Sequence, residues 1–180
     1  MKKNIKAFFK EIVPIIIGIL IAIYINNWNE DRKDKNYINR ISASINKELT
    51  ETNNDIIEKF ALQETLIDTL DFYKKDDKIS ILDILMKVNG VSIPSIKISS
   101  WKAISNSKIE LMEYDKISSL ANIEEEKEIL KAKSNYVMNL VYSNLNDTGI
   151  DKKEILKIMM FDIISTEITI QEEIEVIISE

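Results

Sequence analysis

Three short patterns in this chain have the form of fragments of catalytic sites. The triplet Asp147–Gly149 spells the DTG of aspartic proteases, which need a second aspartate that shares a proton with the first. Ser99-x-x-Lys102 and Ser105-x-x-Lys108 have the Ser-x-x-Lys form of acyl-serine enzymes. The triplet joins two polar helix ends, and no Lys-Thr-Gly follows either serine. We therefore interpret the triplet as a helix cap and the Ser-x-x-Lys pairs as chance matches.

The composition removes most other catalytic groups. The 180 residues include no cysteine and no histidine, which excludes disulfides, thiolate nucleophiles, Ser-His dyads and the usual zinc, haem and iron–sulfur ligands. Four glutamates between residues 124 and 128 fan around one predicted helix, whereas Ca²⁺ or Mg²⁺ needs ligands that converge. The formal net charge of −6 argues against nucleic-acid binding. We predict a protein that is not an enzyme, with no catalytic, cofactor-binding or metal-binding residues.

A segment near the N-terminus has the composition of a membrane span. Residues 12–25 read IVPIIIGILIAIYI, of which ten are Ile, Leu or Val and none is charged. Each of those ten favours insertion by roughly 0.3 to 0.6 kcal/mol. Lys10 can snorkel to the headgroups and Trp28 lies where an interfacial aromatic belongs, so we place an anchor at residues 12–28. No small-x-small cleavage site follows, which favours an uncleaved signal-anchor over a signal peptide.

The end of this segment carries a resemblance. GILIAIYINNWNEDRK, from Gly18 to Lys33, resembles the GILIAxxxNNWNExRK signature of an uncharacterised family of bacterial single-pass membrane proteins, a domain of unknown function found mainly in Bacteroidota. SWKAISNSKIELM, from Ser100 to Met112, is similar to that family's later segment, with residues 106–108 in place of its usual Ser-Gly turn. The resemblance implies a membrane protein with a helical domain outside the cytoplasm, and it supplies no functional residues.

Basic residues on the two sides of the span bear on its orientation. Four lysines precede it, which favours a cytoplasmic N-terminus: Lys2, Lys3, Lys6 and Lys10. A second basic group, interleaved with acids, follows the span, so the opposite orientation stays open. We expect residues 1–11 to be a short basic cytoplasmic tail and residues 29–180 an extracytoplasmic helical-bundle domain. This places the chain in the bacterial inner (cytoplasmic) membrane as a single-pass protein with a periplasmic C-terminal domain.

The most distinctive polar cluster lies at the end of the span. Asn26, Asn27 and Asn29 surround Trp28. Amides at a membrane boundary can hydrogen-bond across helices and define an oligomer or a partner contact, each worth about 0.6 to 2 kcal/mol. The alternative is an interfacial anchor whose amides are solvated. We name Asn26, Asn27, Trp28 and Asn29 as the candidate membrane-interface contact.

Helix breakers are rare in the rest of the chain. Only five residues are Gly or Pro, and long stretches contain neither: 19–89, 95–148 and 150–180. We predict three long helices, the first continuing from the anchor to the KKDDK run at residues 74–78. A short helix is predicted at residues 79–87, and Ser99 can cap another. Between them VSIPSIKIS alternates enough to permit an extended edge.

Apolar residues at helical spacing predict the buried face of each long helix. Gly149 is expected to end the second helix in the left-handed conformation, Asp151 with Glu154 to form the capping box of the third, and Trp101 to fill the core or an interface. The predicted inner faces are Ile38, Ile41, Ile45, Leu49, Ile56, Phe60, Ile67 and Leu70 in the first helix; Ile117, Leu120, Ile123, Leu130, Val137, Val141 and Leu145 in the second, from Asp115 to about Asn146; and Ile155, Met159, Ile163, Thr166, Ile170, Ile174 and Ile177 in the last.

These elements together predict an all-α fold, an N-terminal transmembrane helix continuing into an up-down bundle of three long helices plus short helices. We expect a non-enzymatic protein that acts through protein–protein contacts as an accessory or scaffold subunit of a bacterial envelope assembly. Its partners would be the lipid bilayer and another protein or a second copy of the chain, without nucleic acid. The alternative is a sensor-like bundle that binds a small molecule in an apolar pocket between helices. An exposed apolar stripe on the last helix would indicate a partner.

Overall fold

The computed structural model describes residues 2–179, with the side chains of residues 10–179. Over that range the chain is helical and contains no β-strand, which confirms the predicted all-α class. The chain divides into two compact units, Met1–Ser42 and Ala43–Glu180, and the first helix contributes to both. The elements are α1 (Lys2–Phe72), α2 (Ile81–Val88), α3 (Ser99–Ser105), the 3₁₀ helix η1 (Ile109–Leu111), α4 (Tyr114–Ser143) and α5 (Ile150–Ile178).

The first unit is the N-terminal part of α1. Every residue from Val13 to Lys33 is exposed, although most of those up to Ile25 are apolar. An 18-residue window there has a mean hydropathy of 1.7, and none of it is buried within the chain. This helix is therefore long and apolar enough to cross a membrane.

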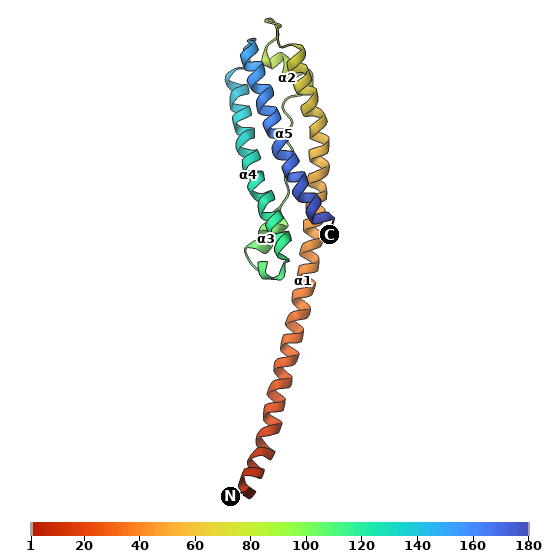
Figure 1. Cartoon of the computed structure of the whole chain (residues 1–180), viewed down its shortest axis with the longest axis vertical. Helices are drawn as coiled ribbons and strands as arrows, with labels where there is room; N and C mark the ends of the chain where they lie inside the picture. Colours follow the sequence, from red (N-terminus) through yellow and green to blue (C-terminus); the bar gives the residue numbers. More distant parts are fainter. Residues whose placement is uncertain (1, 180) are drawn as a thin grey trace. The chain divides into compact units, whose positions relative to one another are not determined.

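The second unit is a bundle in which the later part of α1 lies beside α4 and α5 (Figure 1). Each long helix turns one apolar stripe inward, because residues three and four apart share a helix face. Most of the predicted inner residues are buried, as we expected from their spacing. They are Ile45, Leu49, Ile56, Ile67 and Leu70 of α1; Leu120, Ile123, Leu130, Val137 and Val141 of α4; and Ile163, Thr166, Ile170, Ile174 and Ile177 of α5.

The predicted inner face of α5 is wrong in its first half. Ile155 is exposed and Met159 only partly buried, whereas Leu156 and Met160 are fully buried. The observed stripe follows positions 156, 160, 163, 167, 170, 174 and 177, a regular alternation of four and three. Glu167 lies on this stripe. A prediction that admits only apolar residues to the core therefore misses the stripe. Phe60 of α1, also predicted inside, is exposed.

Three predicted helix caps are not formed. The side chain of Ser99 does not cap α3, which begins at Ser99 itself after Ile98. Gly149 has a φ of −68°, so it does not end α4 in the left-handed conformation, and it directly precedes α5. It gives α5 no capping bond from a side chain, and Asp151 lies inside the helix, so the predicted capping box of Asp151 with Glu154 is not formed. A Cβ at Gly149 would lie 2.9 Å from Asp147 Oδ1, which accepts the Gly149 amide, so a larger residue would displace that side chain.

A capping box does form at α2, where the Ser80 hydroxyl accepts the Asp83 amide and the Asp83 carboxylate accepts the Ser80 amide. The first amides of α2 also reach the α4–α5 turn, with Ile81 N donating to Asp147 O at 3.0 Å and Leu82 N to Leu145 O at 2.9 Å. The α4–α5 turn therefore helps to fix the start of α2.

An extended segment takes the place of a fourth helix in the bundle. We call residues 91–98, which join α2 to α3, the strap. It runs antiparallel to α1, so the chain goes up through α1, down through the strap, up through α4 and down through α5 (Figure 1). Pro94, Ile96 and Ile98 are buried while Ser95 and Lys97 are exposed. This is the alternation expected of an extended segment, but no neighbouring strand pairs with it within residues 2–179.

Candidate functional site

The candidate contact residues lie on consecutive positions of α1 in the first unit. Asn26, Asn27, Trp28 and Asn29 are all exposed, with 58% of Trp28 accessible. Successive residues of a helix are about 100° apart, so these four side chains point in different directions. Asn26 and Asn29, three residues apart, are the closest pair, about 60° apart around the helix. All four side chains face outward from α1, and the membrane-interface contact stays a prediction.

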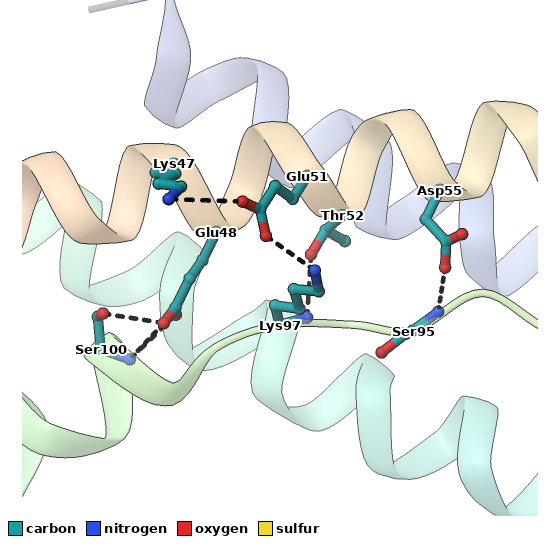
Figure 2. A network of polar contacts seen from close by, with 8 residues as sticks. All are labelled: Lys47, Glu48, Glu51, Thr52, Asp55, Ser95, Lys97 and Ser100. Atoms are coloured by element: carbon teal, nitrogen blue, oxygen red, sulfur yellow. Dashed lines mark hydrogen bonds and ion pairs between the residues drawn. The ribbon is translucent and has the colours of Figure 1, made fainter.

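The bundle contains a polar cluster that was not predicted, and it holds the strap against α1 (Figure 2). A buried or half-buried backbone must satisfy its N–H and C=O groups, and a segment outside any helix or sheet needs partners from elsewhere. Here α1 supplies these partners from its side chains. Asp55 Oδ2 accepts the Ser95 amide at 2.7 Å, and Thr52 Oγ1 accepts the Lys97 amide at 2.9 Å. Side chains of α1 thus take the role that a neighbouring strand would have in a sheet.

The same pattern continues at both ends of the strap. At one end Glu48 accepts the Ser100 amide at 3.0 Å and the Ser100 hydroxyl at 3.0 Å. At the other end Gln63 Nε2 donates to Ser92 O at 2.9 Å. From the α4 side, Lys127 Nζ donates to Ile96 O at 2.7 Å. The strap is therefore held along its length by polar side chains from two helices.

One ion pair covers the outside of this cluster. Lys97 Nζ lies 2.8 Å from Glu51 Oε2, and both side chains are more than two-fifths exposed. The hydrogen bond from Lys97 lowers the pKa of Glu51, and its positive charge acts in the same direction. Because solvent screens this pair, we assign the retention of the strap to the buried Thr52 and the backbone bonds and not to the ion pair.

A second polar contact lies deeper, between α1 and α5. Gln63 Nε2 donates to Glu167 Oε1 at 2.8 Å, and the two side chains are 0% and 1% exposed. The amide orientation follows from its neighbours, because both Ser92 O and Glu167 Oε1 are acceptors. Gln63 Oε1 and Glu167 Oε2 have no hydrogen-bond partner. Both oxygens are acceptors, so a proton on Glu167 Oε2 would give that oxygen a hydrogen bond to donate.

The patterns with catalytic form are not assembled into a site. Asp147 Oδ1 accepts the Gly149 amide at 2.7 Å, so the DTG triplet is a turn. Ser105 Oγ donates to the Lys102 carbonyl on its own helix. Within residues 2–179 no group of three acidic side chains is placed to hold a metal ion. Glu124 instead accepts a 2.8 Å bond from the indole of Trp101, which is buried as predicted.

No family model, curated protein or solved structure matches this chain. Its function is therefore inferred from its own residues, above all the exposed apolar part of α1, the strap and the exposed residues of α5.

A surface hollow of about 310 Å³ lies between the strap and α4. Ile93, Pro94 and Leu130 contribute apolar surface, and Asn135 and Lys127 contribute polar groups. The Lys127 ammonium already donates to the strap carbonyl of Ile96. The other polar side chains that line the hollow, among them Lys131, Ser134 and Asn135, come from one side of α4 and do not enclose a ligand.

We expect Thr52→Val to weaken the attachment of the strap. Valine keeps the shape of the fully buried threonine but leaves the Lys97 amide without its acceptor. The free energy of unfolding should fall by about 1 to 2 kcal/mol, measured by urea unfolding of the full chain in mild detergent. Glu51→Gln, which removes only the exposed ion pairs with Lys97 and Lys47, should leave the midpoint nearly unchanged. Equal effects of the two changes would contradict this assignment.

Proposed function

We propose that this chain is a membrane-anchored, non-enzymatic helical protein that acts through protein–protein contacts as an accessory or scaffold subunit of a bacterial envelope assembly. In this proposal residues 12–28 cross the inner membrane, residues 1–11 are cytoplasmic, and residues 29–180 form a periplasmic bundle. The exposed apolar window of α1 supports the anchor. The side chains of Lys2, Lys3 and Lys6, on which the orientation depends, lie outside the described residues. The sequence segment Gly18–Lys33 supports kinship with the bacterial single-pass family that it resembles.

The observation that carries the contact function is an apolar stripe on the outside of α5. Ile155, Ile158, Phe161 and Ile168 are 41%, 61%, 52% and 46% exposed, and their spacing of three, three and seven places them on one side of the helix. The opposite side of α5 already forms the core. A helix that is apolar on both sides has more apolar surface than its own bundle covers, which is typical of an interaction site.

The contact could be with another protein or with a second copy of the chain. Incorporation of a photoreactive residue at Ile158, followed by irradiation of native membranes, would capture whichever protein covers the stripe, and the mass of the adduct identifies it. We expect adducts from position 158 and none from Lys131, an exposed position on α4. A double change, Ile158→Glu with Phe161→Glu, should abolish the contact and leave the helical content unchanged.

If position 158 gives no adduct, and the detergent-extracted protein has the mass of one chain with nothing copurified, the contact function is wrong. The sensor alternative has weaker support, because the hollow beside the strap lies at the surface and Lys127, one of its two lysines, already holds the strap.

A further inference from the structure

The charges that follow the proposed anchor are separated onto two sides of α1. Residues 28–41, all in the first unit, include four basic and three acidic side chains. With 3.6 residues per turn, the basic positions occupy one sector of about 160° around the helix axis. The acidic positions occupy a separate sector of about 100°. No acidic position lies between two basic ones. The basic set is Arg32, Lys33, Lys35 and Arg40, and the acidic set is Glu30, Asp31 and Asp34.

The neutral residues on the basic side are also hydrogen-bond donors. Trp28, Asn29, Asn36 and Asn39 fall within the same part of the circumference, and each carries a side-chain N–H group. We call these four residues, together with the four basic ones, the basic face. All eight are exposed. The basic face is thus a donor-rich surface that starts where the apolar residues end.

We propose that the basic face binds the phosphate groups of anionic phospholipids in the leaflet next to the bundle, an inference that rests on the proposed anchor. At 1.5 Å per residue, Arg32, Lys33 and Lys35 lie about 6 to 11 Å beyond Trp28. The headgroup region extends about 5 to 8 Å on each side of the hydrocarbon core, so long side chains at these positions reach it. Guanidinium and ammonium groups are the side chains that suit phosphate oxygens.

The separation of charge, and not the net charge, makes this face effective. Residues 28–41 carry an excess of only one positive charge. If the two signs alternated around the helix, they would neutralise each other within the Debye length of about 8 to 10 Å. Because the acids lie on the other side of the helix, the lipids next to the basic face meet only positive charge. Each basic residue near an anionic surface adds to the attraction.

The emission of Trp28 reports on the lipids that surround the basic face. The full chain would be reconstituted into phosphatidylcholine vesicles that contain an equal minor fraction of either brominated phosphatidylglycerol or brominated phosphatidylcholine, since bromine quenches tryptophan on contact. Trp101 is buried in the bundle, and a Trp28→Phe chain measures its background. We expect brominated phosphatidylglycerol to quench Trp28 about twofold more strongly than brominated phosphatidylcholine.

Two charge variants test the face itself. Combined R32Q, K33Q and K35Q should remove the preference for phosphatidylglycerol, whereas combined E30Q, D31N and D34N, the matched change on the other side, should retain it. Equal quenching of the wild-type chain by both lipids would overturn this inference and leave the anchor intact. Absence of quenching by either lipid would overturn the anchor and the inference together.

Discussion

We expect Lys153→Met to lower the free energy of unfolding by about 2 to 3 kcal/mol. Lys153 is only 1% exposed, and its Nζ donates to Tyr73 O at 2.9 Å and Asp76 O at 2.7 Å. Both carbonyls lie in the turn that follows α1, and Tyr73 O also accepts the Asp76 amide at 3.2 Å. Methionine keeps most of the apolar stem and removes both bonds, and urea unfolding of the full chain in mild detergent measures the loss.

Lys157, one turn along α5, provides the matched control. Its Nζ lies 2.6 Å from Asp71 Oδ1, at the edge of the bundle, where nearly half of the Asp71 side chain is exposed. Because solvent screens such a pair, Lys157→Met should cost much less than Lys153→Met. If the two changes cost the same, the buried bonds of Lys153 do not secure the end of α1. Hydrogen exchange gives a second measure, since only Lys153→Met should speed exchange around residues 73–76.

The second large effect is a dependence of stability on pH that comes from Glu167. Burial raises the pKa of this carboxyl to about 7 from 4.5, against the lowering effect of the hydrogen bond from Gln63, and the negative charge of Asp55 adds to the rise. The folded chain therefore holds this proton more tightly than the unfolded chain does. Its contribution to stability is complete below pH 4.5, falls as the pH rises from 4.5 to about 7, and is lost above that range.

The expected size of this effect is about 3.5 kcal/mol, at about 1.4 kcal/mol for each pH unit between the two pKa values. Glu167→Gln is the informative change, because an amide is uncharged like the protonated acid and has the same shape. At pH 5 the variant and the wild type should be similarly stable. At pH 8 the variant should be the more stable of the two by up to that amount.

Other carboxyl groups also titrate, so the difference between variant and wild type is the quantity to measure. Chemical unfolding at several pH values between 5 and 8 gives it directly. Glu172→Gln, on the exposed side of the same helix, should show no divergence from the wild type over this range. A constant difference between Glu167→Gln and the wild type from pH 5 to 8 would show that Glu167 has the same charge in the folded and unfolded chains.

The long helices could be predicted because their signals are local. The scarcity of glycine and proline, and the apolar residues at spacings of three and four, mark α1, α4 and α5 without any knowledge of their neighbours. The same periodicity identified most of the core of the bundle. It failed at the start of α5, where positions 155 and 159 and positions 156 and 160 are equally apolar, and only the packing of α5 against the rest of the bundle selects the second pair.

The polar residues that matter most could not be predicted in this way. Lys153 and Glu167 read as surface residues in the sequence, because a lysine or a glutamate is seldom buried without a partner. Their partners, Tyr73 and Gln63, lie 80 and 104 residues away in the chain. The strap presents the same difficulty, since Thr52 and Asp55 carry no local sign that they accept its backbone amides.

The sequence by itself determined the all-helical class, the apolar segment near the N-terminus and the absence of cysteine and histidine chemistry, because each depends on composition or on spacing along one helix. Only the tertiary structure decided which side of α5 faces inward, how an extended strap takes the place of a fourth helix, and which polar groups are buried. Burying a polar group is favourable only when a partner completes its hydrogen bonds. In this chain those partners come from distant helices, and folding alone brings them together.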